Sequence, residues 1–180
     1  MLESVGTLPA YPVATGEHMH LERTISFSAD LVSVQRVLIS EELARARTEA
    51  GDLDAPQHTV TNAETAPQAV TVVTVPAAKL PDKFRRLINR DVIATITQTW
   101  DGTGPDVARA DFTVDVGSLP VTVSLTQTLT ANGDSTSCTY SGEVKVNMPF
   151  VGAKIEKIAA SKIDGILEGD QKLVNAILAS

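Results

Sequence analysis

The spacing of apolar residues changes once along this chain, near Pro149, and that change limits the folds open to it. Upstream, apolar residues alternate with Thr, Ser or charged residues, which is the period of a strand with one buried face. Downstream, they recur at gaps of three and four, which is a single stripe along a helix. The chain therefore predicts a sheet followed by one helix of about 30 residues, roughly 45 Å long at about 1.5 Å per residue.

Seven segments carry the strand pattern. It is clearest at 121–130, where Val, Leu and Gln alternate with Thr and Ser. Asn132-Gly133 then predicts a hairpin, because both residues tolerate positive φ, and 101–104 and Gly117 predict turns earlier in the chain. The remaining strands are predicted at 20–27, 57–63, 69–75, 90–100, 107–116 and 135–147.

Two short helices are expected between the first and second strands. Ser28 or Asp30 can cap the first, whose apolar residues fall at helical spacing from Leu31 onward. Ser40 can cap the second, and Gly51 ends it.

Charge and composition argue against several classes of protein. With 22 acidic and 15 basic residues the chain carries a net charge of −7, so we expect no nucleic-acid partner, because phosphates would be repelled. No apolar run approaches the roughly 20 residues of a membrane span, and we expect no integral membrane segment. A single cysteine and no secretory signal indicate a cytoplasmic location.

The chain reads as one domain, 18–180, behind a flexible leader, 1–17, that contains Pro9, Pro12 and Gly16. Within the domain the order is strand, two short helices, six strands and the long helix. Tight turns make the strands antiparallel. The apolar face of such a sheet needs a cover, and the C-terminal helix is the only large apolar surface left. A twisted sheet of about seven strands would curve around that helix.

This order resembles the START-like superfamily, also called SRPBCC, whose members include polyketide cyclases and lipid-transfer domains. The junction 142–158 (GEVKVNMPFVGAKIEKI) is similar to that of an uncharacterised actinobacterial branch, known only as a domain of unknown function. Segment 80–88 (LPDKFRRLI) and the strand after it look like the same branch. The resemblance spans roughly 20–180. It implies an α+β helix-grip fold with a cavity for an apolar ligand between sheet and helix.

By alternation, two glutamines point to the inner side of the sheet. A buried Gln needs hydrogen-bond partners, so Gln98 and Gln127 can orient a ligand's carbonyl or hydroxyl; alternatively, they bond to water or backbone near strand ends. The helical stripe that would line the opposite wall includes Ile166 and Leu167. The ligand-binding residues we expect are Gln98, Trp100, Phe112, Gln127, Tyr140, Val144, Ile155, Ile158 and Ile163.

No catalytic set stands out. Cys138 would need a base to form its thiolate, and none of the three histidines, His18, His20 and His58, has an evident route to it. No third ligand completes a metal site with the first two, and no Walker loop or dinucleotide-binding glycine pattern occurs. We therefore expect no metal and no cofactor, and binding rather than catalysis.

The sequence thus predicts binding or transport of an apolar small molecule, such as a lipid, quinone or polyketide-like compound. Two alternatives remain open: a cyclase- or hydratase-type enzyme with Tyr140 as its acid or base, and an interaction module whose cavity is filled by its own side chains. A basic cluster reads as a solvated helix face, and it is also compatible with transient membrane contact. Its residues are Lys79, Lys83, Arg85, Arg86 and Arg90. The sequence carries no signal for an oligomeric state.

Overall fold

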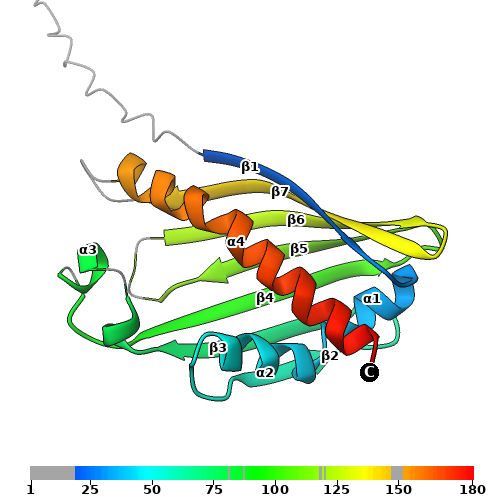
Figure 1. The fold of residues 1–180 in the computed structure, drawn as a ribbon, viewed down its shortest axis with the longest axis horizontal. Helices are drawn as coiled ribbons and strands as arrows, with labels where there is room; N and C mark the ends of the chain where they lie inside the picture. Colours follow the sequence, from blue (N-terminus) through cyan, green and yellow to red (C-terminus); the bar gives the residue numbers. More distant parts are fainter. Residues whose placement is uncertain (1–18, 81, 87, 118, 120, 147–151) are drawn as a thin grey trace, which may run out of the picture.

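A computed structural model describes residues 19–80, 82–86, 88–117, 119, 121–146 and 152–180 (Figure 1). The predicted leader and His18 lie outside these residues. The first elements are β1 (Met19–Phe27), α1 (Leu31–Leu38), α2 (Glu41–Ala50), β2 (Gln57–Thr61) and β3 (Gln68–Val75). They are followed by η1 (Ala77–Lys79), α3 (Asp82–Arg85), β4 (Val92–Thr103), β5 (Val107–Asp115), β6 (Val121–Asn132), β7 (Ser135–Val146) and α4 (Gly152–Leu178).

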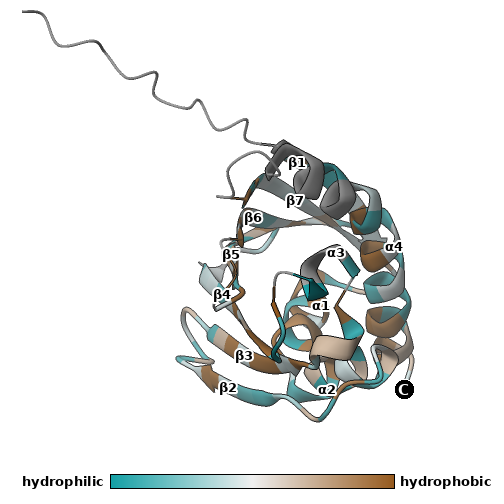
Figure 2. Cartoon of the chain, turned by 90° about the vertical axis from the view of Figure 1, so that its left-hand side faces the viewer, coloured by the Kyte–Doolittle hydropathy of each residue, from teal (hydrophilic) through white to brown (hydrophobic). Residues whose placement is uncertain are grey.

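The strands form one antiparallel sheet in the order β1-β7-β6-β5-β4-β3-β2. From β2 to β7 each strand pairs with its neighbour in sequence, and β1 pairs with β7 at the far edge. The sheet curves, and α4 lies across its concave side, with α1 and α2 toward one end (Figures 1 and 2). The predicted α+β helix-grip architecture is confirmed, including the two short helices between the first two strands.

Two side chains set the starts of the short helices. Asp30, rather than Ser28, caps α1: its carboxylate accepts hydrogen bonds from the Ser33 hydroxyl at 2.7 Å and from the Ser33 N–H at 3.0 Å. These bonds, the hydroxyl's first, lower the pKa of the Asp30 carboxyl. Ser40 caps α2 by accepting from the Leu43 N–H at 3.1 Å, and Gly51 is its C-cap. The capping residues are thus readable from the sequence.

The hairpin between β4 and β5 differs from the predicted turn. The sequence places the end of the strand at Trp100, but β4 continues to Thr103 with a β-bulge in its last residues. Gly102 has a φ of +106°, a conformation that other residues rarely adopt. The bulge lets the strand continue past the turn-forming residues.

The long helix is continuous. α4 runs for 27 residues, through Gly165 and Gly169, each of which weakens an isolated helix by about 1 kcal/mol relative to alanine. Packing against β1, β7, α1 and α2 holds it. The predicted beginning of the helix, at Pro149, lies outside the described residues.

A fully buried cluster fills the space between the sheet, α1, α2 and the C-terminal half of α4. Because its side chains are 4% exposed or less, this closed core leaves little room for solvent. It includes Phe27, Leu38, Leu43, Trp100, Leu129, Cys138, Tyr140 and Val174.

Candidate functional site

Beyond the closed core, the concave face of the sheet carries apolar side chains that remain partly exposed. They come from the central strands β4, β5 and β6, and the strand register makes them neighbours: Ile96 pairs with Val114, which pairs with Val123. The opposite face of β6 is polar and largely exposed, as at Thr122. We call this set the partly exposed patch: Ile96, Phe112, Val114, Val121, Val123 and Leu125.

A chain of hydrogen bonds joins four buried polar side chains next to this patch. The amide of Gln98 donates to Gln127 Oε1 at 2.8 Å. Gln127 Nε2 in turn donates to the Tyr140 hydroxyl at 2.9 Å and to Cys138 Sγ at 3.5 Å. Gln98 is 4% exposed and Gln127 is fully buried. Buried amides need such partners, so this polar chain satisfies much of the hydrogen-bonding capacity of both glutamines.

The polar chain lies at the boundary between the closed core and the partly exposed patch. Gln98 pairs with Phe112 across β4 and β5, and Gln127 pairs with Tyr140 across β6 and β7. The rings of Phe112 and Tyr140 meet edge to face, with centroids 6.2 Å apart and an angle of 82° between their planes. An apolar molecule on the patch would therefore have polar side chains at one end.

Burial controls the charge of this region. It raises the pKa of the Cys138 thiol from 9.0 to about 11 and raises the pKa of the Tyr140 hydroxyl well above its ordinary value. Both groups are therefore neutral at pH 7. A protonated thiol is a poor nucleophile, so the surroundings do not activate Cys138 for chemistry.

One ion pair closes the end of the core under α2. Arg47 of α2 binds Asp170 of α4 through two bonds, Nε to Oδ1 at 2.6 Å and Nη2 to Oδ2 at 2.8 Å. Their side chains are 29% and 11% exposed. Burial disfavours the Arg47 charge, but the hydrogen bonds and the attraction of Asp170 outweigh it and raise the Arg47 pKa. The pair fixes α2 on α4 without leaving a net charge there.

The structure brings together most of the predicted site residues. Gln98, Gln127 and Tyr140 form the polar chain, Phe112 belongs to the patch, and Trp100 and Val144 are buried, at 1% and 2% exposure. Ile163 is partly buried. The side chains of Ile155 and Ile158 lie outside the described residues. A ligand role for this set stays a prediction.

Ile166 does not line the inside. Its side chain is 65% exposed, so the expectation that it faces the sheet is wrong, whereas the next residue, Leu167, packs against the closed core. The apolar stripe that the gaps of three and four define on α4 is wider than the part of the helix that the sheet and the short helices cover.

Sequence reasoning missed two contacts that shape the site. One is the Arg47–Asp170 pair. The other is His58 of β2, whose Nε2 bonds to the Ile39 carbonyl at 2.9 Å and whose Nδ1 bonds to the Thr71 hydroxyl at 2.8 Å. A carbonyl can only accept, so Nε2 is the donor in the first bond. His58 thereby ties the sheet to the turn between α1 and α2.

An open hollow of about 690 Å³ lies elsewhere, at the β4–β5 hairpin. None of the predicted site residues lines it; its lining residues are Thr65, Asp101, Gly102, Gly104, Val107, Ala108 and Arg109. In the described part of the chain, no group of three His, Cys, Asp or Glu side chains could hold a metal ion. No described helix combines the length and apolar character needed to cross a membrane.

Comparison with solved structures shows the same fold at low sequence identity. A STAR-related lipid transfer protein from Xanthomonas axonopodis aligns with a TM-score of 0.58 and 14% identity over 89% of this chain and 86% of its own. A START superfamily protein from Mycobacterium smegmatis aligns with a TM-score of 0.52 and 12% identity over 89% and 99%. Norcoclaurine synthase from Thalictrum flavum gives 0.51 and 13% over 100% and 98%.

These likenesses confirm the START-like fold that the order of elements predicted. No curated protein matches the sequence. Residues 22–178 match a family described as "Protein of unknown function (DUF2505)". This match begins within β1, extends to the end of α4 and includes all the residues of the polar chain. The chain therefore belongs to the DUF2505 family.

Proposed function

We propose that this chain binds an apolar small molecule on the concave side of its sheet, over the partly exposed patch and beside α4. The observation that carries this proposal is the patch itself: six apolar side chains point inward, yet the protein's own side chains do not cover them fully. Covering apolar surface on a concave face with a ligand is favourable, because it removes that surface from water. A ligand burying about 300 Å² would gain roughly 7 kcal/mol before the cost of association.

The fold supports the same proposal more weakly. The Xanthomonas protein is a STAR-related lipid transfer protein, and this likeness supports a lipid as the ligand. We propose a quinone or a polyketide-like molecule as the other apolar ligands that would suit the patch. Norcoclaurine synthase is an enzyme by its description, so the fold alone does not choose between binding and catalysis. Burial raises the pKa values of Cys138 and Tyr140, which argues against a thiolate nucleophile and against Tyr140 as a general base but not as a general acid. We favour binding because the partly exposed patch is apolar.

Native mass spectrometry of the purified chain, followed by organic extraction, tests the proposal directly. We expect a co-purifying apolar molecule that is released unchanged; its conversion to a product would favour the enzyme instead. A neutral apolar dye such as Nile red gives an affinity. If no apolar molecule co-purifies and Nile red does not bind, an interaction module with a filled interior is favoured instead.

A pair of opposite substitutions localises the binding. Val123→Thr places a hydroxyl in the patch without changing its shape, and we expect it to weaken dye binding about fivefold, which is about 1 kcal/mol. Thr122→Val makes the reverse change on the exposed outer face of the same strand, and we expect no effect. Equal affinities for both variants and the unaltered chain would place the dye elsewhere.

Several further expectations remain proposals. We propose that the domain runs from 18 to 180 behind a leader, that the protein is cytoplasmic, and that it comes from an actinobacterial branch without a nucleic-acid partner. Transient contact with an anionic membrane would use Arg86 and Arg90, which are exposed. Two other members of the basic cluster are already paired, Lys79 with Asp52 and Arg85 with Asp82, and the side chain of Lys83 lies outside the described residues.

A further inference from the structure

The indole nitrogen of Trp100 is a buried hydrogen-bond donor without a partner in the part of the chain that the structure describes. The side chain is 1% exposed, and Nε1 has no hydrogen-bond partner among the described residues. Buried tryptophan N–H groups usually have one, because an unpaired donor away from water is costly. A ligand atom that accepts a hydrogen bond from this N–H would explain why the protein leaves it unpaired.

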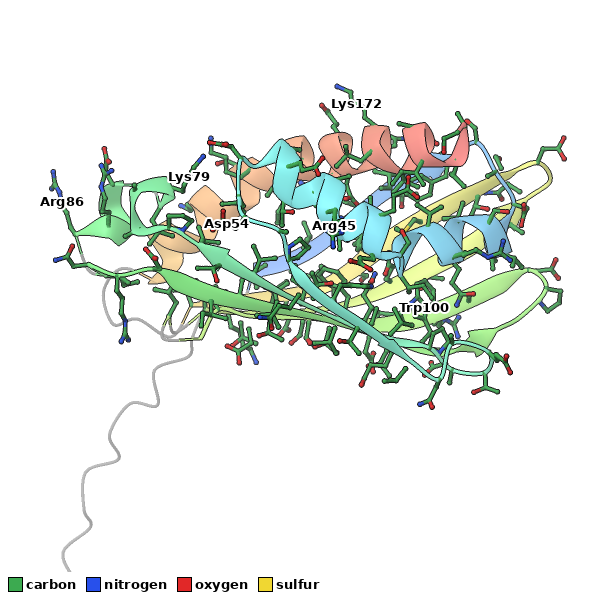
Figure 3. All side chains as sticks on the ribbon, turned by 90° about the horizontal axis from the view of Figure 1, so that it is seen from below. Arg45, Asp54, Lys79, Arg86, Trp100 and Lys172 are labelled. Carbon is green, nitrogen blue, oxygen red and sulfur yellow. The ribbon has the colours of Figure 1, made fainter. Side chains whose placement is uncertain are left out.

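The position of Trp100 relates this donor to the proposed binding surface. Trp100 lies two residues after Gln98 on the inner face of β4, between the sheet and the short helices (Figure 3). Gln98 Nε2 already donates to Gln127 Oε1. Among the described residues, the donor without a partner near the end of the partly exposed patch, where Gln98 pairs with Phe112, is therefore Trp100 Nε1.

The surroundings favour a neutral group at this point. Arg47, whose charge acts on Cys138 and Tyr140, is paired with both oxygens of Asp170 at 2.6 and 2.8 Å. Burial raises the pKa values of Cys138 and Tyr140, which shows that this environment disfavours negative charge. A carboxylate would lose its hydration here, and the Arg47 charge, already paired with Asp170, would not compensate that loss.

We propose that the ligand carries a neutral carbonyl oxygen at one end, and that the Trp100 N–H donates to this oxygen while the apolar remainder covers the partly exposed patch. This inference rests on the proposed function. It requires partly exposed neighbours of the polar chain to shift, because Nε1 is enclosed in this structure. From Ile96 to Trp100 the strand advances about 13 Å at about 3.3 Å per residue, roughly the length of an extended ten-carbon chain.

Three ten-carbon probes separate the possible head groups: 2-decanone, decane and decanoate. Trp100 is the only tryptophan, so the ¹⁵N-labelled chain gives one indole N–H cross-peak that reports on this donor. We expect 2-decanone to move that peak downfield and to displace Nile red at concentrations about fivefold lower than decane does, as for one hydrogen bond to an otherwise unpaired donor. Decanoate should bind more weakly than 2-decanone.

Trp100→Phe keeps an aromatic ring but removes the donor together with the volume of the indole's second ring. We therefore compare the two probes within this variant, and we expect its preference for 2-decanone over decane to disappear. If this variant fails to fold, the comparison of the indole peak with ketone and with alkane in the unaltered chain decides alone.

The outcomes distinguish the two proposals. Equal binding of 2-decanone and decane with an unmoved indole peak overturns the carbonyl inference and leaves apolar ligand binding in place. Tighter binding of decanoate overturns the neutral head group. If none of the probes displaces the dye and the dye itself does not bind, the proposed function fails, and the inference fails with it.

Discussion

Replacing Asp170 with Asn should loosen α2 from α4, because Arg47 would keep its charge and lose its carboxylate partner. In the native chain the two side chains meet through bonds of 2.6 and 2.8 Å. Breaking a fully buried pair by removing one partner costs about 3–5 kcal/mol, and an exposed pair contributes about 0–1 kcal/mol. Because Arg47 is 29% and Asp170 11% exposed, we expect a loss of about 2–3 kcal/mol of unfolding free energy, between those limits.

A second variant separates the ion pair from packing. Arg47→Met combined with Asp170→Leu removes both charges and keeps comparable volume, and we expect this double variant to lie within about 1 kcal/mol of the native chain. The matched control is the exposed pair of Arg45 with Glu41 within α2, at 52% and 58% exposure. Glu41→Gln should cost only about 0.3–0.5 kcal/mol.

Urea denaturation followed by circular dichroism measures all four proteins, provided that the slopes of the transitions agree. The argument from burial is refuted if Asp170→Asn costs no more than Glu41→Gln. It is also refuted if the double variant is less stable than the single one, because the loss would then come from packing rather than from an unpaired charge.

Two further predictions concern other parts of the fold. Gly142→Ala should destabilise by about 1–3 kcal/mol, because the added carbon would lie 2.2 Å from the Ser124 carbonyl oxygen and 2.8 Å from Leu125 Cα; Gly169→Ala, with nothing within 4 Å, should stabilise α4 by up to about 1 kcal/mol, and thermal melts that rank the two variants in the reverse order would contradict this. Burial raises the pKa of Cys138 from 9.0 to about 11, so as the pH rises the thiol ionises first in the unfolded chain. The free energy of unfolding should therefore be unaffected by this group below pH 9 and should decrease between pH 9 and 11. Urea midpoints across that range should fall less steeply for Cys138→Ala, and a native thiol that reacts at pH 8 as fast as the denatured one would show that it is not enclosed.

The sequence was sufficient for the architecture because each central strand is apolar on one side only. The alternation in β6 assigned Val123 and Gln127 to the inner face and Thr122 to the outer one, as the structure has them. The helical spacing after Pro149 then left one element to cover that face. Helix caps were readable for a similar reason, since Asp30 and Ser40 act on backbone groups three residues away.

The site was harder to predict because its contacts join distant parts of the chain. Arg47 and Asp170 lie 123 positions apart on two helices, and periodicity gives the face of a residue but not its partner. Ile166 illustrates the same limit. The helical spacing was predicted correctly, but no other described element covers the Ile166 side chain, which is exposed. The polar chain was partly foreseen: alternation placed Gln98 and Gln127 inside, and only the structure shows that they bond to each other.

The pairing of β1 with β7 has a consequence for how the protein is made. Thr24 and Thr139, joined by a hydrogen bond across these strands, are 115 positions apart, so β1 is synthesised well before its partner β7. Until β7 is made, the apolar side chains of β1, among them Phe27, lack the sheet that buries them in the folded protein. Folding that depends on such distant pairing is slow and exposes the nascent chain to aggregation, and a chaperone that holds the emerging first strand would shorten that exposure.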